Sequence, residues 1–385
     1  MRTQTLKDHT VIFLEGRIDS SNAAEIGNEL DGFLETNGDK EISFDASGLV
    51  YISSAGLRIL MKARKKLGRP VSVTEVSPTV YEIFDTTGFT ELLDVKKAVR
   101  RVSVEGCEVI GKGLYGTVYR LDPDTIVKVY DSPESLPMIE NERKNARMAF
   151  LKGVPTAISY DVVRVGDSYG SVFELLKART FNDMIIEEPE RAETIIAQYI
   201  EFLISVHKTV MDSGSLPAYK DSLIKALEQM KEYTGKTQYP RIKDFILSIP
   251  DKPFLVHGDC QMKNVMLVDD EPMLIDMDTL SLGDPIFDMA GLYVTYKLFN
   301  EDEPGNSLRF LGIEEEMADL IWDRCYEGYL RDTDSKGHEE VLNKIKLLAN
   351  VRYLSVVTSS GLKDGSLGEK RIRNTGRRFE DLLES

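Results

Sequence analysis

The strongest constraint on this chain is one stretch in its last third, FLVHGDCQMKNVML, at residues 254–267. A polar turn lies here between two apolar runs, which predict short strands that would hold the turn rigid. The turn places Asp259 and Asn264 five positions apart, and the string LIDMD, with Asp276 and Asp278, follows shortly afterwards. Acidic loops that only cap helices would not be expected to show these parts in this order.

The residue types in this stretch suit one kind of chemistry. A hydroxyl that attacks a phosphorus atom needs a carboxylate to orient it and to accept its proton, and Asp259 is a candidate for this task. A departing nucleotide needs Mg²⁺, which prefers oxygen ligands in octahedral geometry. Asn264 and Asp276 can supply such oxygens from adjacent turns, so the stretch predicts a magnesium–nucleotide site.

A glycine-rich segment lies well before this stretch: GKGLYGTVY begins at Gly111 and includes Gly113 and Gly116. Because TVYRL continues as a strand, the segment predicts a hairpin and not the strand-to-helix turn of dinucleotide-binding folds. Glycine lets the backbone of such a hairpin approach phosphates closely. Taken alone, the segment could equally be an ordinary glycine turn.

Lys128 is the one cation of the apolar strand IVKVY at residues 126–130. A lysine that points inward from such a strand needs an anionic partner, and nucleotide phosphates together with a helix carboxylate would supply one. Glu142 on the next predicted helix is the best candidate carboxylate and Glu140 is the alternative, although spacing alone does not separate them. The alternative is a surface lysine on an edge strand.

The pattern of elements predicts two domains. Short β-rich and helical runs alternate over residues 1–98, which predicts a small α/β layer domain, and residues 99–106 are predicted to be a linker. Residues 107–176 show five predicted strands and one long helix, whereas residues 177–385 are mainly helical apart from the stretch described above. A β-rich lobe followed by a helical lobe predicts an α+β, two-lobed domain with a cleft between its lobes.

With these motifs, residues 107–385 resemble the aminoglycoside phosphotransferase and choline kinase-like branch of the protein-kinase-like fold. HGD in place of HRD, and IDMD in place of DFG, favour this branch over kinases that act on Ser, Thr or Tyr. The resemblance implies that the cofactors are ATP and Mg²⁺, that Asp259 is the catalytic base and that Asn264 and Asp276 bind the metal. Lys128 would contact the α- and β-phosphates.

The resemblance also implies roles outside the catalytic string. Gly111, Gly113 and Gly116 would cover the phosphates, and the segment from Glu174 to Leu176 would be the hinge that offers backbone groups to adenine. The glycine-rich segment is fuller than in many aminoglycoside phosphotransferases. The acceptor is therefore either a hydroxyl of a small molecule, as is usual for this branch, or a protein.

Other polar residues near the string have expected roles as well. His257 is expected to stabilise the catalytic turn rather than to react. The segment GDPIFD matches a downstream motif of the same branch, in which Asp284 and Asp288 are interpreted as structural. Asp278 is either a second metal contact or a residue that caps the turn.

The string DASGLVYISSAGLRIL, at residues 45–60, leads from a predicted strand into a helix that begins near Ser53 and Ser54. Serines there could simply cap the helix, although a helix N-terminus also favours a phosphate. Residues 3–98 resemble the STAS domain of anti-sigma-factor antagonists. In that alignment Ser54 takes the position of the serine that a partner kinase phosphorylates, while Ser53 replaces the usual Asp.

Composition excludes several other classes of protein. A net charge of −16 argues against sequence-independent binding to nucleic acids or anionic membranes, which requires a basic face. Three scattered cysteines build neither a disulfide framework nor a CxxC metal site, and the four histidines lack ligand spacing. The beginning of the sequence lacks a signal-peptide pattern and no run is long enough to span a bilayer, so a cytoplasmic location is expected.

We therefore predict a phosphotransferase that moves the γ-phosphoryl group of ATP to a hydroxyl of a small molecule, under regulation by a STAS-like module with a protein partner. The alternative hypothesis is a partner-switching signalling protein. Its kinase lobe would phosphorylate a protein serine, such as Ser54 of another copy, or would act as a nucleotide-sensing scaffold.

Overall fold

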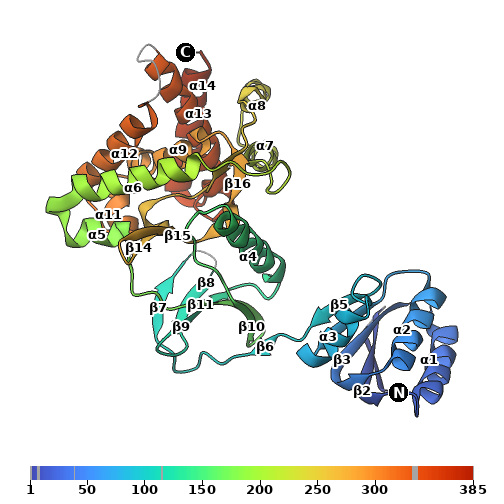
Figure 1. The fold of residues 1–385 in the computed structure, drawn as a ribbon. Helices are drawn as coiled ribbons and strands as arrows, with labels where there is room; N and C mark the ends of the chain where they lie inside the picture. The colour runs from blue at the N-terminus through green and yellow to red at the C-terminus, as the bar shows by residue number, and fades with distance from the viewer. Residues whose placement is uncertain (1, 7–8, 39, 114–115, 332–336, 385) are drawn as a thin grey trace. The chain divides into compact units, whose positions relative to one another are not determined.

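A computed structural model describes residues 2–6, 9–38, 40–113, 116–331 and 337–384 (Figure 1). All further statements concern these ranges. Within them, no helix has the length and apolar character that would be needed to cross a membrane.

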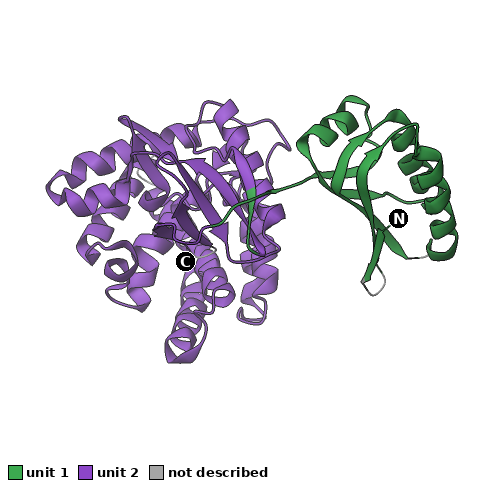
Figure 2. Cartoon of the chain, turned by 90° about the horizontal axis from the view of Figure 1, so that it is seen from below, with its two compact units in different colours: residues 1–103, 163–166 green, residues 104–162, 167–385 purple. Residues whose placement is uncertain are grey.

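The chain divides into two compact units, residues 1–103 with 163–166 and residues 104–162 with 167–385 (Figure 2). The division falls within the segment that we predicted as a linker. This segment is partly structured, because β6 (Arg100–Arg101) pairs with β10 (Asp161–Val165) in parallel. The predicted linker therefore includes a short strand.

The first unit is a five-stranded sheet with three helices, in the strand order β1-β2-β3-β4-β5. β1 and β2 are antiparallel, and the later neighbours are parallel. Parallel strands need crossover connections, which the helices provide. The elements are β1 (Arg2–Leu6), β2 (His9–Ile18), α1 (Ala23–Asn37), β3 (Glu41–Ile52), α2 (Ser54–Leu67), β4 (Ser72–Val76), α3 (Pro78–Thr86) and β5 (Asp94–Lys97).

One element of this unit differs from its prediction. The sequence pattern suggests a strand that ends near Asp45 and a separate apolar stretch at residues 49–52, but β3 is continuous through both. The β2–β3 pairing shifts register between Phe13 and Glu15, which lets the strand continue past the polar Ser-Gly pair. Both ends of β3 therefore face the same core, and the aromatic ring of Phe44 is fully buried there.

The small lobe is built on a six-stranded sheet in the order β6-β10-β11-β9-β8-β7, of which β7, β8, β9 and β11 lie wholly in the second unit. The predicted strands and long helix of this lobe are present, and the sheet gains β6 at its edge. Its further elements are β7 (Val109–Lys112), β8 (Gly116–Arg120), β9 (Thr125–Tyr130), α4 (Leu136–Leu151) and β11 (Ser168–Glu174).

The rest of the second unit is mainly helical, and two small sheets, β12-β14-β15 and β13-β16, carry the polar turn and its flanking strands at residues 254–267. The helices are α5 (Phe181–Glu187), α6 (Ala192–His207), α7 (Tyr219–Gln229), α8 (Gln238–Ser248), α9 (Ile286–Tyr293), α10 (Phe299–Asp302), α11 (Asn306–Leu311), α12 (Glu315–Tyr329), α13 (His338–Ser359) and α14 (Gly365–Glu384). The strands are β12 (Arg179–Thr180), β13 (Phe254–Val256), β14 (Val265–Val268), β15 (Glu271–Leu274) and β16 (Ser281–Gly283).

The C-terminal helices are part of the core of this unit. α13 is buried at each position from Leu347 to Val351, so that side chains on every side of the helix are covered, as expected for a central helix. α14 runs beside it and buries Phe379 completely. These helices are therefore fixed in place and can carry side chains to a precise position.

Replacement of Phe379 by alanine should lower the free energy of unfolding by about 3–5 kcal/mol, because a large buried ring leaves a cavity. Phe310, which is 61% exposed, is the matched control, and Phe310→Ala should change stability by less than about 0.5 kcal/mol. Denaturant unfolding of both variants measures the difference. Equal effects would show that α14 is not packed as described.

Candidate active site

The histidine–glycine–aspartate turn follows β13, and its backbone admits only glycine at the middle position. Gly258 has φ of +83°, a value that favours glycine. A Cβ atom there would lie 2.9 Å from the Cβ of Thr279 and 3.0 Å from its carbonyl oxygen. The turn thus packs directly against the segment that follows the LIDMD string.

Asp288 on α9 anchors this turn through its backbone. Its fully buried carboxylate accepts hydrogen bonds from the amide of His257 at 2.9 Å and the amide of Gly258 at 2.7 Å. Nε2 of His207 lies 2.8 Å from the same carboxylate. Burial alone would raise the pKa of Asp288, but the hydrogen bond from His207 and its charge outweigh burial and lower it. The anchor is therefore an ionised carboxylate.

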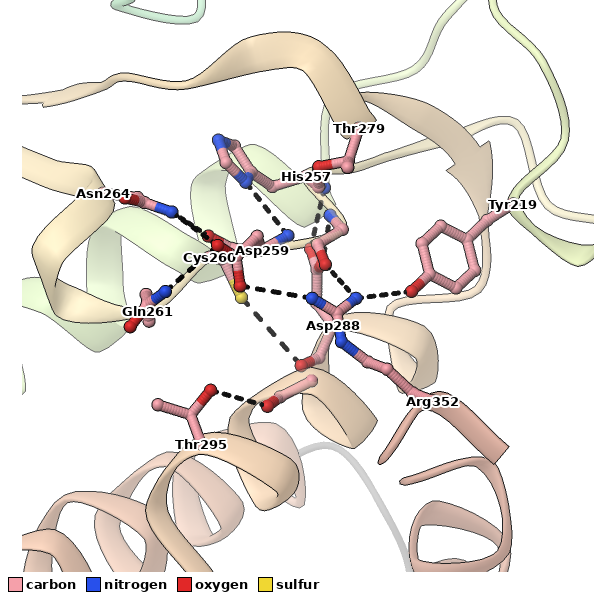
Figure 3. Close-up of polar contacts among 12 residues, drawn as sticks. Tyr219, His257, Asp259, Cys260, Gln261, Asn264, Thr279, Asp288, Thr295 and Arg352 are labelled. Carbon is pink, nitrogen blue, oxygen red and sulfur yellow. Dashed lines mark hydrogen bonds and ion pairs between the residues drawn. The ribbon is translucent and has the colours of Figure 1, made fainter. Parts of the chain in front are cut away.

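The side chain of Asp259 is surrounded by donors (Figure 3). Nδ2 of Asn264 lies 2.8 Å from Oδ2 of Asp259 and 2.8 Å from its backbone oxygen. Nε2 of Gln261 donates to Oδ2 at 3.0 Å, and Nη2 of Arg352 donates to Oδ1 at 3.2 Å. Both carboxylate oxygens are therefore held in fixed directions.

The same contacts fix the amide of Asn264. Its two partners on Asp259 are acceptors, so the nitrogen must face them and the oxygen Oδ1 is turned elsewhere.

The β14–β15 hairpin places Asp276 near Asn264. Its turn consists of Asp269 and Asp270, both with positive φ, as a primed two-residue turn requires. The amide of Ile275 donates to the carbonyl of Asn264 at 3.0 Å, which brings Asp276 beside it.

Asp276 lies opposite the lysine of the small lobe. Its backbone is left-handed, with φ of 63°, a strained conformation that often occurs at functional sites. Nζ of Lys128 lies 2.5 Å from Oδ1 of Asp276 and 3.4 Å from both carboxylate oxygens of Glu142. The hydroxyl of Tyr130 donates to Oε2 of Glu142, one of the two oxygens that Lys128 contacts, whereas Glu140 is exposed to solvent. The structure therefore selects Glu142 as the lysine's helix carboxylate.

These contacts keep Lys128 charged. Burial lowers the pKa of Lys128, but the carboxylates of Glu142 and Asp276 outweigh burial and raise it above its usual value. The pKa of Asp278 is raised as well, to about 7, by burial and then by the negative charges of Asp276 and Glu142. The ammonium group of Lys128 thus partly balances the negative charge of Glu142, Asp276 and Asp278.

The glycine-rich segment forms the β7–β8 hairpin, whose two tip residues, 114 and 115, lie outside the described residues. Its glycines differ in what surrounds them. A Cβ on Gly116 would lie 2.3 Å from the carbonyl oxygen of Val129, so this glycine is needed for the contact with β9. The nearest atoms to a Cβ on Gly111 or Gly113 lie 3.7 Å away, so the fold itself would accept a side chain at both.

The predicted hinge lies where β11 leaves the small lobe. Glu174 is the last residue of that strand, and the connection continues through Leu176 to β12. The amide of Leu175 already donates to the carbonyl of Asp124 at 2.7 Å, so it is not available to a ligand.

In the first unit, Ser53 and Ser54 have different positions. Ser53 caps α2, because its hydroxyl accepts the amide of Ala55 at 3.2 Å. Ser54 is the first residue of the helix and is exposed. The side chain of Ser53 therefore caps the helix, whereas the side chain of Ser54 is accessible to solvent.

Sequence reasoning missed Arg352 and left Gln261 without a role. Gln261 lies within the catalytic string, and its position two residues after Asp259 was a usable signal. Arg352 lies 93 residues after Asp259, and a single arginine in a helix carries no motif. Only the fold brings it to the turn.

Comparison with known proteins identifies a family for each part of the chain. The phosphotransferase enzyme family matches residues 106–324, and a STAS domain of the Mlab type matches residues 1–94. Over 85 residues the chain is 33% identical to a putative anti-sigma factor antagonist, BtrV, of Bordetella bronchiseptica, a match that covers 21% of this chain and 72% of that protein.

Solved structures of aminoglycoside phosphotransferases are similar in fold. A thermostable mutant of APH(4)-Ia, in ternary complex with AMP-PNP and hygromycin B, has a TM-score of 0.50 at 11% identity, covering 72% of this chain and 93% of that one. ADP-bound APH(2'')-Ib has a TM-score of 0.49 at 16% identity, with the same coverage of 72% and 93%.

The chain belongs to the phosphotransferase enzyme family, with a STAS domain at its N-terminal end. The predicted fold classes, an α/β domain followed by a protein-kinase-like α+β domain, are confirmed.

Gly116→Ala should lower the free energy of unfolding by about 1–3 kcal/mol, because the added methyl group collides with the backbone of β9. Gly113→Ala is the matched control and should leave stability nearly unchanged. Thermal unfolding of both variants without nucleotide tests this. Equal stability of the two would contradict the described approach of β8 to β9.

Asp278 should make stability depend on pH. Its pKa is about 7 in the folded chain and 3.8 in its ordinary state, so the folded state binds its proton more tightly. Stability is therefore lost as pH rises between these values. Asp278→Asn removes the ionisation and should raise the melting temperature more at about pH 8 than at about pH 5. Thermal unfolding in a metal chelator measures this, and an equal gain at both pH values would contradict it.

Proposed function

We propose that this protein transfers the γ-phosphoryl group of ATP to a hydroxyl of a small molecule, with Mg²⁺. One observation carries the proposal: a chain of hydrogen bonds, which passes through the amide of Ile275, connects Lys128, Asp276, Asn264 and Asp259 within one unit. This places a cation, two candidate metal ligands and a candidate base together, which is the arrangement that phosphoryl transfer needs.

The donor set fits a nucleotide-bound magnesium ion. Asp276 offers a carboxylate and Asn264 offers its free Oδ1, both of which are hard oxygen ligands. Among the described residues, no group of three or more His, Cys, Asp or Glu could hold a metal ion. A protein site with so few ligands suits Mg²⁺, which keeps waters and takes its remaining ligands from phosphates. When bound, the ion would neutralise charge on the phosphates.

The chain's own residues would then do the following work. Asp259, fixed on both oxygens, would orient the acceptor hydroxyl and accept its proton. Lys128, held charged by Glu142, would neutralise the α- and β-phosphates. The space beside Gly111 and Gly113, where a Cβ atom would have no neighbour closer than 3.7 Å, supports a close approach of phosphate to their backbone.

The predicted hinge and Gly116 would have supporting roles. Gly116 would allow β8 to lie close to β9 and so would fix the position of the β7–β8 hairpin. Backbone groups of the segment from Glu174 to Leu176, other than the amide of Leu175, would bind adenine. We propose domain limits of 1–98, 99–106 and 107–385 for the regulatory module, linker and kinase domain, with lobes that meet after residue 176.

We further propose that the STAS domain regulates the transferase through a protein partner and that Ser54 is its phosphorylation site. The hydroxyl of Ser54 is exposed at the first position of α2, where a phosphate would be stabilised by the free amides of the helix. Phosphorylation would need no change in the Ser53 cap.

A screen of small hydroxyl compounds that follows ADP release is the direct test. Asp276→Ala serves as the background, because this variant should lose Mg²⁺-dependent nucleotide binding. Release that depends on a small acceptor supports the proposal. Autophosphorylation that disappears in Ser54→Ala would instead favour transfer to a protein.

Asp259→Ala should lower kcat by about 100- to 10,000-fold and change ATP affinity far less, because the lost carboxylate acts on the acceptor and not on the nucleotide. Turnover and nucleotide titration on the same preparation measure both quantities. Turnover within a few-fold of the unmodified protein would show that another group is the base.

Glu142→Gln should weaken ATP binding because Lys128 loses one of its two carboxylate partners. The exposed neighbour Glu140 on the same helix provides the matched control, and Glu140→Gln should bind ATP normally. Nucleotide titration of both variants distinguishes them. Equal binding would remove Glu142 from the site.

A further inference from the structure

Arg352, on α13, contacts the catalytic turn from the side opposite to Asn264 and Gln261 (Figure 3). Its Nη2 donates to Oδ1 of Asp259 at 3.2 Å. Its Nη1 donates to the backbone carbonyl of Gly258 and, at 2.6 Å, to the hydroxyl of Tyr219. One guanidinium group thus holds both the backbone and the carboxylate of the same turn.

The guanidinium is itself confined. Its side chain is only 18% exposed, and a Cβ at Gly291 on α9 would lie 3.5 Å from its Cζ, so that the group packs against the helix backbone. Tyr219, the acceptor on its other side, lies against Phe287 with 4.9 Å between ring centroids. α7, α9 and α13 together therefore leave Arg352 little freedom to move.

We propose that Arg352 is a positioning residue for Asp259, an inference that rests on the proposed function. Arg352 holds Oδ1, while Gln261 and Asn264 hold Oδ2, so the plane of the carboxylate is set from both sides. Misplacement of a catalytic group by about 1 Å can cost on the order of 100-fold in rate. Arg352 acts on the reaction only through Asp259.

The chemistry of the contact requires arginine. A planar guanidinium donates from two nitrogens in fixed directions, here to a carbonyl and to a carboxylate, whereas a lysine ammonium is a single point charge. Arg352 also stays charged: burial lowers its pKa, but Tyr219 and Asp259 outweigh burial and raise it.

This assigns a direct role to a segment beyond the family match. The match to the phosphotransferase family ends at residue 324, whereas α13 spans His338–Ser359. The last helices of the chain would therefore complete the site as well as the core.

The test compares Arg352→Ala with Arg378→Ala in the full chain. Arg378, on α14, is an equally covered arginine, 20% exposed, whose Nη2 lies 2.6 Å from the buried Asp302, away from the turn. ADP release from Mg²⁺–ATP is measured with water as acceptor, with and without added guanidinium at a non-denaturing concentration. Hydrogen exchange over residues 257–264 supplies a readout that does not depend on turnover.

Arg352→Ala should lower kcat by about 10- to 100-fold, with the KM for ATP changed by less than about threefold. Added guanidinium should restore activity several-fold, and Arg352→Lys should restore less. The turn should exchange faster in Arg352→Ala and slow again with guanidinium. Arg378→Ala should lose stability without this kinetic change or rescue.

Three kinetic results would overturn the assignment: a kcat within about twofold in folded Arg352→Ala, the same rescue in Arg378→Ala, or a loss of activity that guanidinium does not restore. A fourth, unchanged hydrogen exchange at the turn, would also overturn it. If the unmodified protein releases no ADP with water or with any compound of the acceptor screen while the exchange results hold, the proposed function fails and the contact of Arg352 with the turn remains.

Discussion

The candidate site depends on the buried carboxylate of Asp288, which fixes the backbone of the turn that carries Asp259. Asp288 accepts the amides of His257 and Gly258 while it pairs with His207, so an ionised group with no solvent access fixes the turn before any ligand arrives. Removal of one partner would leave a buried charge unsatisfied, which is far more costly than loss of a surface contact. The side chain of Asp259 projects from a turn that is already rigid.

Two further constraints place the remaining groups. The β14–β15 hairpin sets Asp276 beside Asn264, and the sheet of the small lobe carries Lys128 to Asp276. Elements that are far apart in the chain thus meet within one compact unit. The fold determines the relative positions of the groups, and their residue types determine what they can bind.

Much of this could be predicted from sequence because the informative residues are close together in the chain. The HGD turn, Asn264 and the LIDMD string share a short segment with fixed spacing. The choice between Glu142 and Glu140 needed the helix in place, since only the orientation of α4 buries one and exposes the other. Arg352 could not be found, because it reaches the turn only through the packing of α13 against α9. The continuity of β3 was missed because a register shift, which sequence does not encode plainly, carries the strand past Ser47 and Gly48.

The close contact between Lys128 and Asp276 has a consequence for the order of ligand association. In the metal role that we propose for Asp276, a free divalent cation would have to compete with the ammonium group of Lys128 for this carboxylate, and it would bring no other anion for that ammonium group. A triphosphate that carries the cation also brings an anion for Lys128, so the ammonium group can exchange Asp276 for a phosphate and keep an anionic partner throughout. Under the proposed function, metal and nucleotide would therefore enter as a preformed complex, and the ion without nucleotide would have weak affinity.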